Sequence, residues 1–175
     1  ITVLRKDLKY PLLKKDETTY EIIRFIELKG KSDYSIGDSI ASIKKIANKV
    51  EVGCGLADHG QGYGLFNFNQ EMLKQNKKPI LGCEFYISKN YDHLTLLAKN
   101  KDGYQDLIRL ISLGNSRLTK EDLDDKLARP YLEIEDLKNI NVDNFVVLHG
   151  YDNSYINRAI ENKDIISAEK YLETL

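Results

Sequence analysis

The stretch Leu56-Ala57-Asp58-His59-Gly60 decides the fold, because an apolar run here ends on a carboxylate and an imidazole. The run from Gly53 to Ala57 is typical of a short strand that is buried on both faces. Two more apolar runs follow, at Pro79–Ile87 and His93–Ala98, with helical spacing between and after them. Buried strands that alternate with helices predict the α/β class, as a layered sheet or a barrel.

Periodicity predicts the other elements and the domain bounds. Residues 1–20 are expected to form an N-terminal arm, and residues 21–175 a single domain. The expected strands are Glu21–Leu28, stopped by Gly30, and Asn144–Leu148. The expected helices are Ser39–Ala47 with Asp38 as N-cap, Leu65–Gln75 with Phe66, Phe68 and Met72 facing the core, an amphipathic helix around Tyr104–Ile111, Glu133–Ile140, Ile156–Ile160 and Ile165–Leu175.

Composition excludes several classes of protein. The chain has 175 residues, 42% hydrophobic and 30% charged, which is ordinary for one soluble domain. A formal net charge of −1 argues against a purely electrostatic DNA binder, although it is compatible with a local basic patch. No apolar run approaches the roughly 18 residues of a membrane span, and no signal peptide is expected. Cys54 and Cys83 lie in apolar runs, so we expect buried free thiols and a cytoplasmic protein.

Four candidate metal ligands lie at or near the predicted strands: Asp58, His59, Glu84 and His93. Side chains at strand ends around one pocket can hold a divalent metal and its activated water. Each residue also has a structural explanation when taken alone, such as a loop cap for Asp58 or a solvent-facing position for Glu84. A carboxylate within an apolar strand is unfavourable unless it is paired or bound to metal, so the four together favour a site.

Two lysines, Lys29 and Lys31, flank Gly30 at the end of the first predicted strand. An ammonium group in a metal pocket repels the cation and can take over part of its neutralising role. A solvated loop is the alternative for this pair. His149, which ends the last predicted strand, is a weaker candidate for a site residue.

Four segments, taken in order, carry a family resemblance. Phe25–Ser35 resembles Phe-Val-His-Leu-His-x-His-Ser-x-Tyr-Ser, and Leu56–Gly64 resembles Leu-Thr-Asp-His-Gly-x-x-Tyr-Gly. Lys78–Tyr86 resembles Lys-Pro-Ile-x-Gly-x-Glu-x-Tyr, and His93–Ala98 resembles His-Leu-x-Leu-Leu-Ala. These are motifs of the PHP (polymerase and histidinol phosphatase) domain at the N-terminus of bacterial replicative DNA polymerase III alpha subunits. The resemblance implies a distorted, TIM-like βα barrel, which we expect to be incomplete here, because residues 21–175 would supply about the N-terminal two-thirds of the family's domain.

The resemblance also implies a metal site that is vestigial or partial. Family members with intact motifs hold metal ions and act as phosphoesterases, in some cases as 3′–5′ exonucleases. By position, His59, Glu84 and His93 match ligands, and Asp58 lies beside His59 in the same motif. The three histidine positions of the first motif hold Glu27, Lys29 and Lys31. Glu27 can still bind a hard metal, whereas protonated lysines cannot.

The leading hypothesis is a degenerate PHP domain of a replicative polymerase alpha subunit, or of a standalone or viral relative. Its role would be structural and partner-binding, and the polymerase active site lies outside this segment. The resemblance implies the polymerase core, other replisome proteins and a proofreading exonuclease as partners, with DNA met only indirectly and no membrane. No cofactor is expected. If the site does hold a metal, the expected ion is Mn²⁺ or Zn²⁺. The alternatives are an active metal-dependent phosphoesterase or 3′–5′ exonuclease and a metal-free interaction protein.

Overall fold

The computed structural model of the chain describes residues 26–88, 92–120, 122, 129–149 and 154–174. Its centre is one mixed sheet whose strands run in the order β1-β2-β3-β5, with the short β4 also paired to β2. The strands are β1 (Gly53–His59), β2 (Lys78–Ile87), β3 (Asp92–Ala98), β4 (Tyr131–Leu132) and β5 (Phe145–His149). The expected α/β class is confirmed, and the open sheet is consistent with an incomplete barrel.

The strand directions place the carboxyl ends of β1, β2, β4 and β5 at the same end of the sheet. Strands β1 and β2 are parallel, and β4 is parallel to β2. Strand β3 is antiparallel to both β2 and β5, so β5 runs in the same direction as β1 and β2. The predicted strands at Gly53–Ala57, Pro79–Ile87, His93–Ala98 and Asn144–Leu148 are each confirmed to within two residues at either end.

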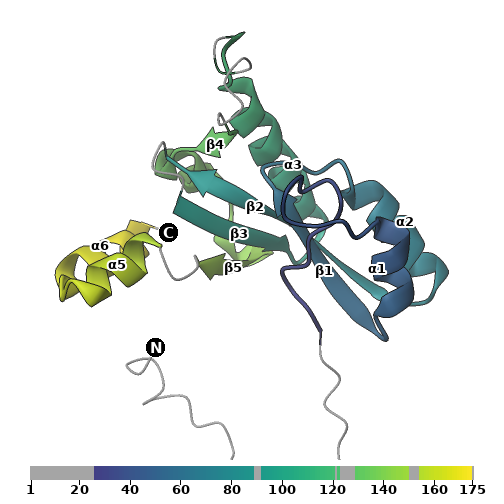
Figure 1. The fold of residues 1–175 in the computed structure, drawn as a ribbon. Coiled ribbons are helices and arrows are strands. Elements are labelled where there is room, and N and C mark those ends of the chain that lie inside the picture. Colours follow the sequence, from purple (N-terminus) through teal and green to yellow (C-terminus); the bar gives the residue numbers. More distant parts are fainter. Residues whose placement is uncertain (1–25, 89–91, 121, 123–128, 150–153, 175) are drawn as a thin grey trace, which may run out of the picture.

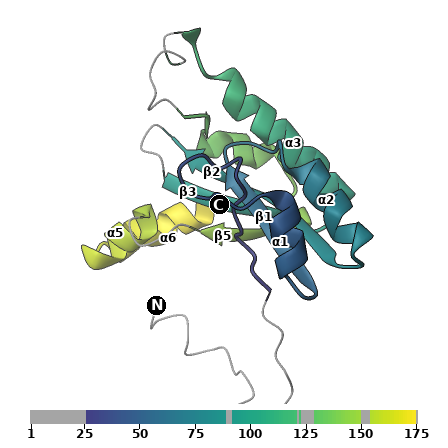
Figure 2. The same cartoon turned by 45° about the vertical axis from the view of Figure 1, so that its right-hand side comes forward.

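Helices cover one face of this sheet (Figures 1 and 2). They are α1 (Ile43–Lys49), α2 (Leu65–Lys74) and α3 (Lys101–Ser116), followed by the 3₁₀ helices η1 (Ile134–Asn139) and η2 (Val142–Asn144). The core joins alternate strand residues such as Leu56, Phe85 and Leu96 to Phe68 of α2 and Leu107 of α3. Alternation in a strand therefore leaves the residues between them on the opposite face.

A helical pair, α5 (Tyr155–Glu161) and α6 (Ile165–Thr174), has its own small apolar cluster on the side of β5 (Figures 1 and 2). It is tied to β3 through the buried carboxylate of Asp92. One oxygen of Asp92 accepts hydrogen bonds from the Tyr155 backbone N–H at 3.1 Å and from the Tyr171 hydroxyl at 3.3 Å. The pair is thus attached to the sheet mainly by polar and ring contacts rather than by the main core.

The expected strand over residues 21–28 is not borne out where it can be followed. Residues 21–25 and the expected arm at 1–20 lie outside the described residues, and residues 26–28 are not a strand. Instead, a single parallel bridge joins Gly30 to Leu56. The segment passes very close to β1 because Gly55 has no side chain: a Cβ there would lie 2.1 Å from the Leu28 carbonyl oxygen. Backbone contact with β1, rather than strand propensity, therefore fixes this segment.

Two local predictions are wrong for tertiary reasons. Helix α1 begins at Ile43 after Ser42, four residues later than predicted, and Asp38 is not its cap. Phe66 was expected to face the core with Phe68 and Met72, but it is 68% exposed, whereas the other two are fully buried. Because of these departures, the side chains of Asp38 and Phe66 are available for the roles described below.

Candidate metal centre

The candidate site lies on the face of the sheet opposite the helices, across strands β1, β2 and β3. His59 is the last residue of β1 and pairs in register with Glu84 in β2. His93, near the start of β3, pairs with Tyr86, two residues beyond Glu84 and on the same face. Parallel and antiparallel pairing thus bring together three side chains that are 34 residues apart at most in the sequence.

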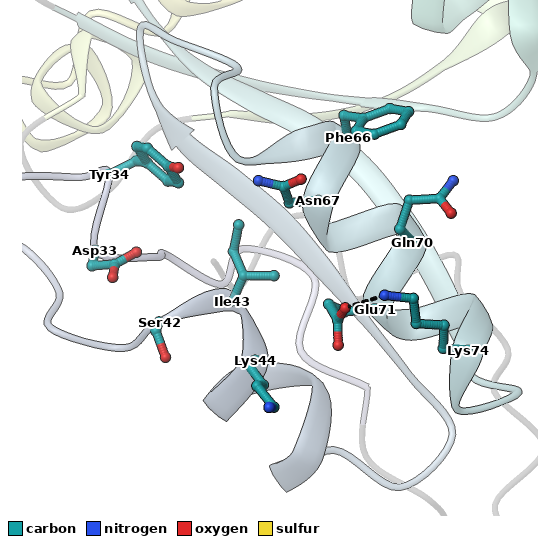
Figure 3. A pocket seen from close by; sticks show the side chains of 10 residues that line it. All are labelled: Asp33, Tyr34, Ser42, Ile43, Lys44, Phe66, Asn67, Gln70, Glu71 and Lys74. Atoms are coloured by element: carbon teal, nitrogen blue, oxygen red, sulfur yellow. Dashed lines mark hydrogen bonds and ion pairs between the residues drawn. The ribbon is translucent and has the colours of Figure 1, made fainter.

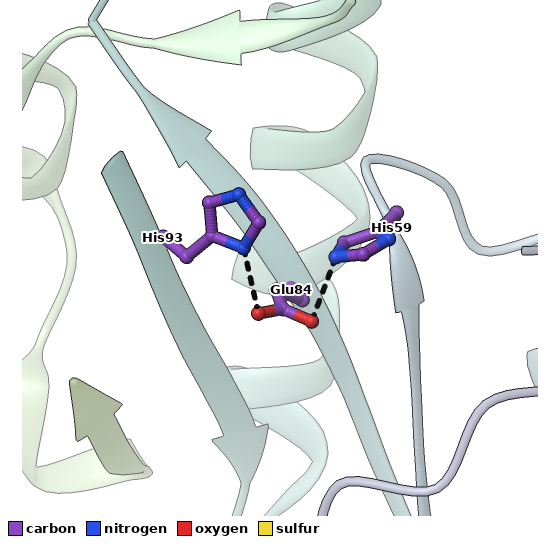
Figure 4. Close-up of side chains that lie close together, drawn as sticks. All are labelled: His59, Glu84 and His93. Atoms are coloured by element: carbon purple, nitrogen blue, oxygen red, sulfur yellow. Dashed lines mark hydrogen bonds and ion pairs between the residues drawn. The ribbon is translucent and has the colours of Figure 1, made fainter. Parts of the chain in front are cut away.

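The two histidines approach the Glu84 carboxylate from opposite sides (Figure 4). His59 Nε2 lies 2.9 Å from Oε2, and His93 Nδ1 lies 3.0 Å from Oε1. One ligand atom from each of His59, Glu84 and His93 lies within 4.8 Å of the others. Tyr86 supports both rings, since it stacks on His59 at 5.3 Å and meets His93 edge-on at 4.8 Å. Two histidines and one glutamate form a donor set that zinc sites use.

The two lysines of the first motif also reach Glu84. Lys29 Nζ lies 2.6 Å from Oε1, and Lys31 Nζ contacts Oε2. Lys31 additionally donates to the Ala57 carbonyl oxygen at 2.5 Å. The backbone bridge at Gly30 places both side chains over the end of β1, so the solvated-loop alternative for this pair is wrong.

Electrostatics of the cluster centre on Glu84, whose side chain is only 3% exposed. Burial would raise the pKa of this carboxyl, but donors from His59 and His93 and from the two lysines outweigh burial and hold the pKa well below its usual range. Glu84 is therefore ionised, and each of its oxygens already faces an ammonium group. A divalent cation fits here only if both ammonium groups leave or lose their protons, so the cluster as it stands does not fit a metal.

Asp58, the other predicted acid, lies outside this group of ligands. Its buried carboxylate accepts hydrogen bonds from the Ser32 backbone N–H at 2.7 Å, the Ser32 hydroxyl at 2.7 Å and the Ser35 hydroxyl at 2.6 Å. It holds the loop that follows Lys31, which makes it a support for the site.

Glu27 and His149 are also placed away from the cluster. Glu27 is exposed, and its carboxylate accepts the Lys29 backbone N–H at 2.8 Å. His149 ends β5 and stacks on Tyr171 of α6 at 5.5 Å. Burial lowers the pKa of His149, while Asp92 opposes this shift.

Sequence reasoning missed one member of the site, Asp38. Its carboxylate contacts His59 Nδ1, so that His59 lies between Asp38 and Glu84. A carboxylate on the far nitrogen of a histidine fixes the orientation of the ring. The sequence offers one signal, an acid seven residues after Lys31 in a loop, but capping rules predict Asp38 as the N-cap of α1, a position that Ser42 holds.

Both cysteines are buried and free, as predicted. Burial, with a smaller contribution from Glu27, raises the pKa of the Cys54 thiol to about 11, and burial also raises the pKa of Cys83. These thiols are therefore structural rather than nucleophilic. Among the described residues, no helix combines the length and apolarity needed to cross a bilayer.

Comparison with known proteins gives one family. A family model described as "PHP domain" matches residues 27–175. The DNA polymerase III subunit alpha of Borreliella burgdorferi is 36% identical over 126 residues, which are 58% of this chain and 11% of that protein. The subunits of the same name from Haemophilus influenzae and Chlamydia pneumoniae are 36% and 38% identical, over 54% and 51% of this chain and 9% of each relative. A solved structure assigned as a metal-dependent phosphoesterase of Bifidobacterium adolescentis has a TM-score of 0.39 and 12% identity, over 66% of this chain and 50% of that one.

Proposed function

The chain belongs to the PHP domain family, and from that premise we propose that it is a PHP domain of the polymerase III alpha type whose metals are replaced by lysine ammonium groups. Its role is structural and partner-binding rather than hydrolytic. One observation carries this proposal: Lys29 and Lys31 take one oxygen each of the central carboxylate, Glu84.

The replacement is chemically consistent. Two ammonium groups together carry the same positive charge as one divalent cation. They therefore neutralise Glu84 and donate hydrogen bonds to its oxygens in a site that is nearly dry. A catalytic metal polarises a phosphoryl oxygen through an empty orbital and lowers the pKa of a bound water. An ammonium group does neither. The substitution thus preserves the attachment of residues 29–31 to the sheet while removing the hydrolytic chemistry.

The proposed context is replication. The similar proteins are named DNA polymerase III subunit alpha, and this chain covers 11% of the length of one and 9% of two others. Proposed partners are the polymerase core, other replisome proteins and a proofreading exonuclease, with DNA met through them. A cytoplasmic location suits this context and the free thiols of Cys54 and Cys83. No cofactor is proposed for the site in its lysine-bound form.

A second candidate function is a metal-dependent phosphoesterase or 3′–5′ exonuclease. The observation in its favour is the close grouping of the ligand atoms of His59, Glu84 and His93. In that case Mn²⁺ or Zn²⁺ has to displace Lys29 and Lys31 from Glu84, and Glu27 would have to move to join the ligands.

Hydrolysis assays separate the two functions. The chain is incubated with bis-p-nitrophenyl phosphate and with a 3′-labelled oligonucleotide, with and without Mn²⁺ or Zn²⁺, beside a Glu84→Gln variant. The proposal expects no metal-dependent cleavage above the variant's background. Cleavage by the native chain that disappears in Glu84→Gln would overturn it in favour of the phosphoesterase.

A further inference from the structure

A groove of about 530 Å³ is lined by residues of α1, α2 and the loop before α1, and none of its lining residues belongs to the Glu84 cluster (Figure 3). It runs between α1 and α2, and Asp33 and Tyr34 of the loop that precedes α1 also line it. Ten side chains line it, and they combine rings, amides and charges: Asp33, Tyr34, Ser42, Ile43, Lys44, Phe66, Asn67, Gln70, Glu71 and Lys74. A groove of this size accommodates a small molecule or a few units of a polymer.

Aromatic rings lie exposed along the groove and its rim. Phe66 is 68% exposed and Tyr34 is 42% exposed. Tyr63, three residues before Phe66, is 73% exposed, and its ring lies 6.4 Å from that of Tyr34. Single exposed apolar residues are ordinary, but two exposed rings that line one groove, Tyr34 and Phe66, with Tyr63 beside Tyr34, form a surface that can stack on another flat ring system.

Positive charge is concentrated on the same two helices. Helices α1 and α2 together contain four lysines and one acid, although the whole chain has a net charge of −1. The acid, Glu71, is paired with Lys74 at 2.6 Å. Lys44, Lys45 and Lys49 of α1 are exposed, and α1 contains no acidic residue. The lining of the groove is balanced, with Lys44 and Lys74 against Asp33 and Glu71, and the exposed Lys45 and Lys49 of α1 add positive charge beside it.

We infer that this groove, defined by α1, α2 and Tyr34, binds single-stranded DNA. Exposed rings beside a row of lysines are complementary to unpaired bases joined by phosphates, because each base has a face to stack and each link carries a charge. The exposed amides of Asn67 and Gln70 offer both donors and acceptors to base edges (Figure 3). Paired bases are stacked inside a duplex and cannot reach the rings, so a duplex fits poorly. The choice of DNA over RNA rests on the replication context of the proposed function, to which this inference adds a direct contact with DNA.

The first test measures binding of the chain to fluorescent dT20 by anisotropy, with an rU20 strand and a DNA hairpin as competitors. We expect a dissociation constant between about 1 and 100 µM at low salt, with weaker binding of the hairpin. Replacing Lys44, Lys45 and Lys49 with Gln removes three potential phosphate contacts and should reduce the slope of log K against log salt by about 2. The matched control replaces Lys138, Lys163 and Lys170, which lie away from the groove, and leaves the slope unchanged.

The second test identifies stacking on Phe66. Phe66→Ala should weaken dT20 binding by about tenfold. Phe66→Tyr retains a ring and the affinity, whereas Phe66→Leu retains apolarity and loses the affinity. Ile166→Ala, which removes an exposed apolar side chain of α6, serves as the control.

Three results would overturn the inference: no binding at about 100 µM protein in low salt, full affinity in Phe66→Leu, or equal binding of the hairpin. Tighter binding of rU20 would overturn the choice of DNA. None of these variants touches Glu84, so hydrolysis and metal content remain as wild type, and failure here is separable from failure of the proposed function.

Discussion

Removing one ammonium group from Glu84 should destabilise the whole domain. In Lys31→Met the carboxylate keeps Lys29 and the two histidines but loses the contact of Lys31 with Oε2. The substitution also removes the donor to the Ala57 carbonyl oxygen. Met retains most of the volume of the lysine stem, so the effect reports the charge and the hydrogen bonds rather than a cavity.

The magnitude follows from burial. The side chains of Lys31 and Glu84 are 16% and 3% exposed, so water screens their interaction poorly. Removing one partner of a buried pair typically costs about 3–5 kcal/mol, and we expect the lower value, about 3 kcal/mol, because Lys29 remains. In a chain of this length that corresponds to a fall of about 6–12 °C in Tm.

Urea unfolding followed by circular dichroism, on a double-mutant cycle, tests this reasoning. The cycle compares Lys31→Met, Glu84→Gln and the double variant. Once the carboxylate is neutral, loss of Lys31 should matter less, so a coupling of about 2 kcal/mol is expected. Lys74→Met, which breaks the exposed pair with Glu71, is the control and should change the midpoint little. A Lys31→Met variant as stable as this control, or a coupling near zero, would refute the reasoning.

Three further predictions concern the same framework. Because the folded pKa of Glu84 lies below its unfolded value near 4.5, this group stabilises the fold above that pH, and the stabilisation is lost as the pH falls through and below it. The urea midpoint should therefore fall more between about pH 6 and pH 3 in the native chain than in Glu84→Gln. Asp58→Ala removes three hydrogen bonds to a carboxylate and should cost about 3 kcal/mol, with faster hydrogen exchange in residues 32–35. Gly55→Ala places a Cβ 2.1 Å from a backbone oxygen of the segment that leads to the lysines and should cost at least about 2 kcal/mol, whereas Gly114→Ala, with contacts of 3.4 Å or more, should not.

The sheet could be predicted because its strands are continuous apolar runs. Gly53–Ala57, Gly82–Ile87 and Leu94–Leu97 are buried on both faces, and such burial is visible in the local sequence as a continuous apolar run. The segment before Gly30 could not be placed the same way. Its position depends on the missing side chain of Gly55, which lies 25 residues further along the chain, and on backbone hydrogen bonds to β1.

The candidate site was predictable in membership but not in its contacts. His59, Glu84 and His93 follow from motif positions, and strand register brings them together. That Lys29 and Lys31 bind Glu84, rather than extend into water, depends on the path of the backbone over β1. Asp38 was missed because its role is a contact across the loop to His59, and local helix-capping rules carry no information about such contacts.

Metal content tests the central claim most directly. The chain is purified without chelator, beside a Lys29→His, Lys31→His variant that restores histidines at two positions of the first motif, and both are analysed by plasma mass spectrometry. Melting is then measured with and without Mn²⁺ or Zn²⁺. We predict far less than one metal per native chain and no gain in Tm, but metal uptake by the variant with a stability gain of about 2.7 kcal/mol at a hundredfold excess over its Kd. Near-stoichiometric metal in the native chain, with a clear gain in Tm, would contradict the claim that lysines have taken the place of metal.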